Sequence, residues 1–115
     1  MRHRKTKSVI DRKAAPRRAL IRHLAEAFIV QGQVKSSPVK IRVVQRVVEK
    51  AITLARTNTL ASRRKLLQAF SEKSVKKLLE DLGPKYKDRK GGYTRRIHAG
   101  PRRGDNSQQV YLELV

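Results

Sequence analysis

The chain has 115 residues, of which 29 are Lys or Arg and 9 are Asp or Glu, so its formal net charge is +20 at pH 7. It contains no cysteine, which excludes disulfides, thiolate metal sites and thiol catalysis. No segment approaches the roughly 20 apolar residues of a membrane-spanning helix, and no apolar run follows the basic start as in a secretory signal. The length predicts a single domain, and the charge predicts a polyanionic partner, with nucleic acid the leading candidate.

Residues 1–13 predict a basic arm rather than a folded element. They contain one acid, Asp11, and only Val9 and Ile10 could anchor them to a core. Like-charge runs of this kind usually become ordered on a partner. We therefore divide the chain into an RNA-binding arm, residues 1–13, and one domain, residues 14–115.

A first helix is predicted to begin at Pro16, because proline at the start of a helix loses no hydrogen bond. Gly32 is expected to end it, and a short strand around Val34 follows. The apolar residues of this helix recur at the spacing of one helical face: Leu20, Ile21, Leu24, Ala25 and Phe28.

The strongest predicted helix runs from Val39 to about Arg56, after the start signal Ser37-Pro38. Its apolar residues recur every three or four positions, and this periodicity outweighs the low helix propensity of its valines. They are Val44, Val47, Val48, Ala51, Ile52 and Ala55.

Two shorter helices are predicted next, Leu60 to Phe70 after the cap residues 57–59, and Glu72 to Leu82. Gly83-Pro84 is expected to stop the second of them. The residues expected to be buried are Leu66, Leu67 and Phe70 in the first helix, and Val75, Leu78, Leu79 and Leu82 in the second.

The remaining segment predicts a basic loop over residues 84–92 and two strands, Tyr93 to His98 and Val110 to Val115. Alternating Val110, Leu112 and Leu114 give the last strand one apolar face for the helices. The predicted fold is therefore α+β: about four helices packed with a small mixed sheet made of one short strand and a C-terminal hairpin.

The N-terminal arm and the first helix hold the main candidate RNA contacts. Six of these nine cations are Arg, whose planar guanidinium grips phosphate with two hydrogen bonds. A merely solvated arm would carry balancing acids, which are missing here. The candidates are Arg2, Arg4, Lys5, Lys7, Arg12, Lys13, Arg17, Arg18 and Arg22, with His3 as a further contact when protonated.

Arg63 and Arg64 are predicted as contacts on the third helix, and Gly91-Gly92 precedes the candidates Tyr93 and Arg95. The two glycines would let the backbone approach RNA while Tyr93 stacks on a base and Arg95 meets a phosphate. A bulged strand entry with Tyr93 in the core explains the same residues equally well.

Arg102 and Arg103 are the last candidates, in the connection between the two final strands. Gly104 or Asn106 can adopt a positive φ there, and Asp105 can cap its own turn.

No enzyme, metal site or cofactor is predicted. His3, His23 and His98 lie far apart in the sequence without metal-ligand spacing, and no nucleophile, phosphate-loop or dinucleotide motif is present. We therefore expect no catalytic residue, no small-molecule substrate and no membrane partner.

Several segments in order resemble the bacterial large-subunit (50S) ribosomal protein L-seventeen family over essentially the full chain. They are Met1-Arg2-His3-Arg4-Lys5, Arg17 with Ala19 and Arg22, Ser36-Ser37-Pro38, Val47-Val48-Glu49, Ile52-Thr53-Leu54-Ala55, Arg63-Arg64, Leu82-Gly83-Pro84, Gly91-Gly92-Tyr93-Thr94-Arg95, Arg103-Gly104-Asp105-Asn106 and Leu112-Glu113-Leu114-Val115.

The resemblance implies helices packed with a small mixed sheet and a structural role in translation and subunit assembly. It also implies binding to large-subunit ribosomal RNA (23S rRNA) near the exit side of the peptide tunnel, among neighbouring large-subunit ribosomal proteins. The implied location is the ribosome, in a bacterial cytoplasm or an organelle matrix. The alternative from another class is a nucleoid-type DNA-architectural protein, and an RNA-cleaving enzyme that uses His98 ranks third.

Overall fold

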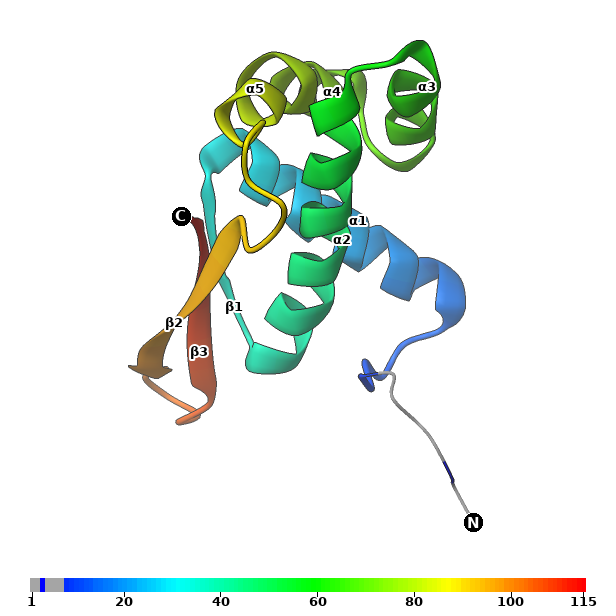
Figure 1. The fold of residues 1–115 in the computed structure, drawn as a ribbon. Coiled ribbons are helices and arrows are strands. Elements are labelled where there is room, and N and C mark those ends of the chain that lie inside the picture. Colours follow the sequence, from blue (N-terminus) through cyan, green and yellow to red (C-terminus); the bar gives the residue numbers. More distant parts are fainter. Residues whose placement is uncertain (1–2, 4–7) are drawn as a thin grey trace.

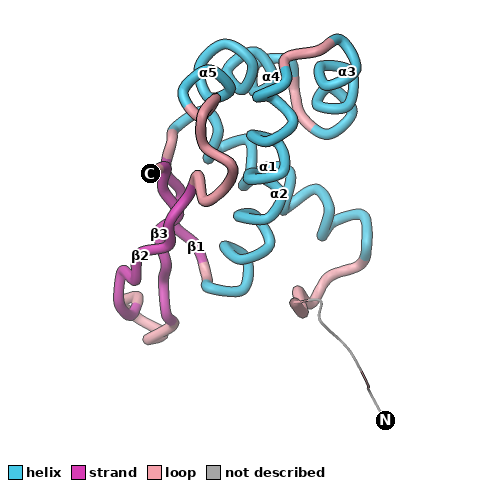
Figure 2. The backbone as a smooth tube through the Cα atoms, in the orientation of Figure 1, coloured by secondary structure: helices cyan, strands magenta, loops and turns pink. Residues whose placement is uncertain are grey.

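The computed structural model describes residue 3 and residues 8–115, and it shows helices packed against a small sheet (Figure 1). The N-terminal end leads into the first helix, and the C-terminus lies at the end of the sheet (Figure 2). In chain order the elements are α1 (Ala14–Gln31), β1 (Gln33–Ser36), α2 (Pro38–Thr57), α3 (Leu60–Ala69), α4 (Glu72–Lys77), the π-helical turn η1 (Leu78–Leu82), α5 (Gly83–Lys85), β2 (Thr94–Pro101) and β3 (Gln108–Leu114).

Helix α1 begins two residues before the predicted start. The first N–H groups of a helix need no intrahelical partner, so Pro16 fits in the first turn, and Arg17 N–H donates to the Lys13 carbonyl at 3.0 Å. Gly32 ends the helix as predicted, with a φ of 81°, and its N–H donates to the Phe28 carbonyl at 2.7 Å. The chain then enters β1 directly.

Helix α2 confirms the strongest predicted helix. Ser37 precedes it, Pro38 is its first residue, and Asn58 ends it in the left-handed conformation with a φ of 46°. Ser37 makes no capping hydrogen bond through its side chain. The predicted apolar face is buried except for Val47, which is partly exposed, and Ile41 joins the buried face.

Helix α3 begins with the predicted cap chemistry, because the Thr59 hydroxyl accepts a hydrogen bond from Ser62 N–H at 3.2 Å. Leu66 and Phe70, four residues apart, share one face and are buried. The prediction that Leu67 is buried is wrong: its side chain is 42% exposed, because it lies about 100° around the helix from Leu66.

The Gly83-Pro84 pair does not stop the fourth helix, contrary to prediction. The chain stays helical from α4 through η1 and α5, and Gly83 N–H donates to the Leu78 carbonyl five residues back. A β-carbon on Gly83 would lie 2.8 Å from the Ala55 carbonyl oxygen. This glycine therefore serves close packing against the end of α2 rather than termination.

The sheet has the strand order β1-β3-β2 and is antiparallel throughout rather than mixed. Val34 pairs with Leu112 on one side of β3, and Arg95 pairs with Glu113 on the other. Strand β2 extends three residues beyond its predicted end, and an irregularity between His98 and Gly100 keeps it paired with β3.

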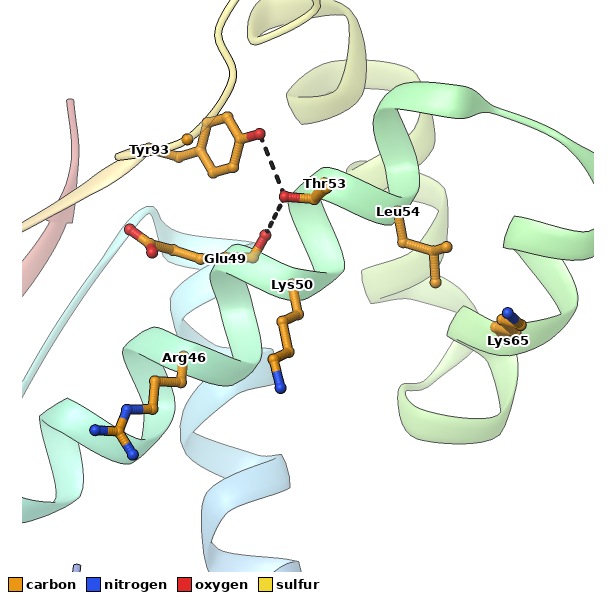
Figure 3. Close-up of a pocket in the computed structure, with 8 residues that line it drawn as sticks. Arg46, Glu49, Lys50, Thr53, Leu54, Lys65 and Tyr93 are labelled. Atoms are coloured by element: carbon orange, nitrogen blue, oxygen red, sulfur yellow. Dashed lines mark hydrogen bonds between the residues drawn. The ribbon is translucent and has the colours of Figure 1, made fainter. Parts of the chain in front are cut away.

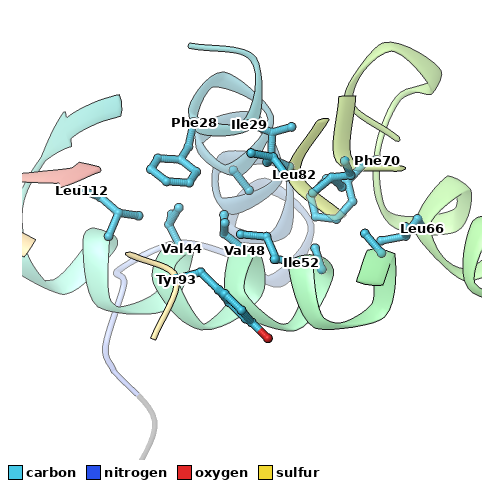
Figure 4. Close-up of a cluster of buried hydrophobic side chains, with 14 of the residues drawn as sticks. Phe28, Ile29, Val44, Val48, Ile52, Leu66, Phe70, Leu82, Tyr93 and Leu112 are labelled. Carbon is cyan, nitrogen blue, oxygen red and sulfur yellow. The ribbon is translucent and has the colours of Figure 1, made fainter. Parts of the chain in front are cut away.

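The hydrophobic core lies where α1, α2, α4 with η1, and the sheet meet (Figure 4). Phe28 of α1, Val44 and Val48 of α2, Leu82 of η1 and Leu112 of β3 all meet there, each 3% exposed or less. Val110 and Leu112 are buried and Leu114 partly so, which confirms the predicted apolar face of the last strand. Fully burying one such side chain contributes about 1.5 to 3 kcal/mol.

Candidate nucleic-acid interface

The arm candidates are only partly within the described residues. Arg2, Arg4, Lys5 and Lys7 lie outside them, whereas His3, Arg12 and Lys13 are exposed. The assignment of residues 1–13 as an RNA-binding arm stays a prediction.

On α1, Arg18 and Arg22 lie four residues apart on one exposed face, and Arg17 is half-buried. Arg22 Nε lies 3.5 Å from the Glu26 carboxylate, at the outer limit of a hydrogen bond. An exposed pair of this kind contributes little to stability. Most of the positive charge on this face is therefore available to an external anion.

Glu26 is held mainly by α4 rather than by Arg22. Its carboxylate accepts a hydrogen bond from the Ser71 N–H at 2.6 Å, directly before α4. Partial burial raises the pKa of Glu26, but the Ser71 hydrogen bonds and the nearby Arg22 charge outweigh this effect and lower the pKa below its ordinary value. Glu26 thus ties α1 to α4, as does Lys77, whose Nζ donates to the Val30 carbonyl at 2.5 Å.

Arg63 and Arg64 lie exposed on α3, and no ion pair found among the described residues includes either of them. Both side chains are therefore open to an external anion, in the way that the sequence predicts.

The hairpin candidates differ in how free they are. Arg95 Nε lies 2.6 Å from the carboxylate of its cross-strand neighbour Glu113. Arg102 pairs with Asp105 within the turn, whereas Arg103 is exposed and outside the ion pairs of the described chain. In this hairpin the uncompensated charge therefore lies on Arg103.

The hairpin turn itself follows the predicted chemistry. Gly104 and Asn106 both have a positive φ, and the Asp105 carboxylate accepts from Ser107 N–H at 3.2 Å. Hydrogen bonds from Arg102, and then from Ser107, hold the pKa of Asp105 well below its usual range, and Asp105 in turn raises the pKa of Arg102.

Tyr93 is a core residue, and the stacking contact predicted for it is wrong. Its side chain is 1% exposed, its ring centroid lies 5.2 Å from that of Tyr86, and its hydroxyl accepts from Arg56 Nη1 at 3.0 Å. A buried ring has no free face for a base. The bulged-entry alternative, with Tyr93 in the core, is the one the structure supports.

A basic groove along α2 was not among the predictions, and we call it the α2–β2 groove. It consists of three adjoining cavities of about 540, 450 and 230 Å³. The first two share Arg46 and Glu49, and the last two share Arg42 and Arg96. Its cations are Arg42, Arg46 and Lys50 of α2, Lys65 of α3 and Arg96 of β2, with His98 at one end.

Part of this groove could have been found in the sequence, since Arg42, Arg46 and Lys50 recur every four residues and so share one helical face. Its other wall could not, because Lys65 and Arg96 reach the groove only through tertiary packing. Figure 3 shows Arg46 and Lys50 on α2 and Lys65 on the neighbouring α3, with Tyr93 and Thr53 at the side of the site.

No group of three or more metal-ligating side chains, and no helix long and apolar enough to cross a bilayer, occurs in the described part of the chain. The fold and this surface together define a small α+β protein with several uncompensated clusters of Arg and Lys.

Comparison with known proteins places the chain in a family. The family model described as ribosomal protein L17 matches residues 20–115. Large ribosomal subunit protein bL17 of Natranaerobius thermophilus is 43% identical over 107 residues, which cover 92% of this chain and 95% of that protein. The chain therefore belongs to the ribosomal protein L17 family, as its sequence motifs predict.

Two further relatives carry the same name. Large ribosomal subunit protein bL17 of a Thermoanaerobacter species is 41% identical over 107 residues, covering 92% of this chain and 96% of that protein. That of Bdellovibrio bacteriovorus is 41% identical over 114 residues, covering 98% of this chain but 63% of the relative, which is longer.

Proposed function

We propose that this chain is a structural constituent of the large ribosomal subunit that binds and stabilises large-subunit ribosomal RNA. The relatives that match nearly the whole chain are named as large ribosomal subunit proteins. The function requires no catalytic residue and no cofactor. The protein acts in translation and subunit assembly, within the ribosome and beside neighbouring large-subunit proteins. The resemblance of its motifs to the family motivates its position near the exit side of the peptide tunnel.

The observation that carries this proposal is the excess of cations that the protein leaves uncompensated. The net charge is +20, and in the described residues only Glu26, Asp105 and Glu113 form ion pairs. An RNA backbone neutralises such a surface and releases condensed counterions, which favours binding.

Arg and Lys on different elements share this task. Arg18 and Arg22 of α1, Arg63 and Arg64 of α3, and Arg103 of the hairpin turn are exposed and held in place by a folded core. Fixed positions of this kind favour a folded RNA surface over the non-specific attraction of a flexible tail.

The test is cosedimentation of the purified protein with bacterial large ribosomal subunits lacking their own copy of this family member, over a salt series. We expect saturable association at low salt, with the logarithm of the affinity falling linearly against the logarithm of the salt concentration. Failure to associate even at low salt rejects the proposal.

A competition experiment separates the proposal from a DNA-architectural role. Large-subunit ribosomal RNA should displace duplex DNA from the protein at equal nucleotide concentration, because the fixed Arg clusters match a folded RNA surface. Preference for duplex DNA would instead favour the nucleoid-type alternative.

A further inference from the structure

The α2–β2 groove is a surface separate from the one formed by α1 and the arm. None of its lining residues belongs to α1 or to the described residues that precede α1. Helix α1 packs against α2 (Figure 1), where Val44, Val48 and Ile52 are buried, whereas Arg42, Arg46 and Lys50 are exposed. The groove thus lies along a different face of α2.

The charge in this groove is not neutralised by its own acid. Glu49 is the one carboxylate among the lining residues, and its Oε1 accepts from the Thr94 hydroxyl at 2.8 Å. Gln45 Nε2 donates to the same Thr94 oxygen at 3.1 Å, which fixes the Glu49 carboxylate against β2. No ion pair found in residues 8–115 includes a cation of the groove.

The spacing of the cations suits an extended anion. Arg42, Arg46 and Lys50 follow each other every four residues, which places successive side chains about 6 Å apart along the helix axis. This interval is similar to that between successive phosphates of one nucleic-acid strand. A single small anion would occupy one position in such a row, whereas a phosphodiester backbone follows all of it.

The side of the groove offers no exposed ring for a base. Tyr93, the one aromatic residue that lines it, is 1% exposed. Its hydroxyl lies 3.3 Å from Thr53 Oγ1, and Thr53 donates to the Glu49 carbonyl at 3.0 Å (Figure 3). The chemistry that remains on this surface is contact with phosphates, which positions a strand without reading its sequence.

We propose that the α2–β2 groove binds the phosphate backbone of an RNA strand, as a second contact surface independent of α1 and the arm. This inference rests on the proposed function, since the strand belongs to the same ribosomal RNA. Arg42, Arg46 and Lys50 meet successive phosphates, and Lys65 and Arg96 bind from the flanking elements.

The first test compares two variants of the full-length protein that lose the same charge. Arg46→Gln/Lys50→Gln removes two exposed groove cations, and Lys73→Gln/Lys76→Gln removes two exposed cations of α4. Binding to purified bacterial large-subunit ribosomal RNA is measured over a salt series, after thermal unfolding has shown that both variants are folded.

The groove variant should bind more weakly than the α4 variant at every salt concentration. Its slope of log affinity against log salt should be shallower by about 1.4 to 1.8, since each phosphate that the protein no longer neutralises removes about 0.7 to 0.9. Equal affinities and slopes in the two variants overturn the groove. If the unmodified protein itself does not bind this RNA, the proposed function fails instead.

The second test uses the unmodified protein and its own lysines. Acetylation by a small reagent is followed residue by residue, with and without the ribosomal RNA. The RNA should protect Lys50 and Lys65, whereas Lys73 and Lys76 should stay reactive. Unchanged reactivity of Lys50 and Lys65, or equal protection of all four lysines, overturns the inference.

Discussion

Single side chains decide which cations of this protein face outward uncompensated. The sequence predicts Arg95 and Arg102 as RNA contacts, and the structure pairs them with Glu113 and Asp105. Exposed pairs are weak, so a phosphate can compete for both side chains. Glu26 has a different task, because its carboxylate holds the start of α4 on α1 through the Ser71 N–H.

Replacement of Glu26 by Gln tests this link and its dependence on pH. Gln keeps an acceptor for Ser71 N–H but loses the charge, so the free energy of unfolding at pH 7 should fall by about 0.3 to 1 kcal/mol. The pKa of Glu26 is lowered in the folded protein from its ordinary value of 4.5. Its stabilisation is therefore complete above that value and disappears as the pH falls through the folded pKa.

Urea unfolding of the two proteins at pH 7 and at pH 3 measures this difference. Glu80→Gln, at an exposed position, serves as the control with the same change of charge. A loss that is equal at both pH values, or that Glu80→Gln reproduces, would show that the Glu26 charge does not hold α4.

At the level of elements, the arm and the helices have different relations to the core. Residues 8–13 precede α1, and Val9 among them is 72% exposed. Helices α1 and α2 in contrast contribute Ala25, Phe28, Ile29 and the buried face of α2 to the core. We therefore expect the arm to serve binding and the helices to serve stability.

Deletion of residues 1–13 should separate these two properties. RNA binding should weaken strongly, with the slope against salt falling by about 0.7 to 0.9 for each phosphate that the arm neutralises. The midpoint of thermal unfolding should stay nearly the same, because the deleted segment ends where α1 begins. Circular dichroism and the salt series provide the two measurements. An unfolded truncated protein would mean that the arm is part of the core.

Considered as a whole, the molecule balances an ordered core against strong repulsion between its charges. The buried residues form one cluster that draws on the helices and the sheet. A net charge of +20 on a chain of 115 residues opposes this compaction in the absence of an anion. Screening by salt and binding of a polyanion should therefore both stabilise the fold.

Thermal unfolding of the isolated protein checks this expectation. Raising the salt from about 0.01 M to about 0.15 M shortens the Debye length from about 30 to about 8 Å, so the midpoint should rise. A gain of 1 kcal/mol corresponds to about 4 to 8 °C in a small domain. Added ribosomal RNA should raise the midpoint further, since it binds the native state. A midpoint that falls with salt would show that repulsion does not limit stability.

The sequence by itself determined those features that depend on local periodicity and composition. The apolar spacing in α2, the glycine that ends α1 and the alternation in β3 correctly predicted these elements, because each signal lies within one or two turns or one strand. The family also followed from short motifs in order. The excess of cations was evident from composition alone.

Only the tertiary structure decided the features that depend on contacts between distant residues. The sequence predicts a helix stop at Gly83, yet the lack of a side chain there allows close packing on Ala55 of α2. Tyr93 had two possible roles until the Arg56 hydrogen bond and the Tyr86 contact placed it in the core. Lys65 and Arg96 meet the cations of α2 only after folding. The physical reason is that burial and electrostatic environment come from packing between elements, which local spacing does not encode.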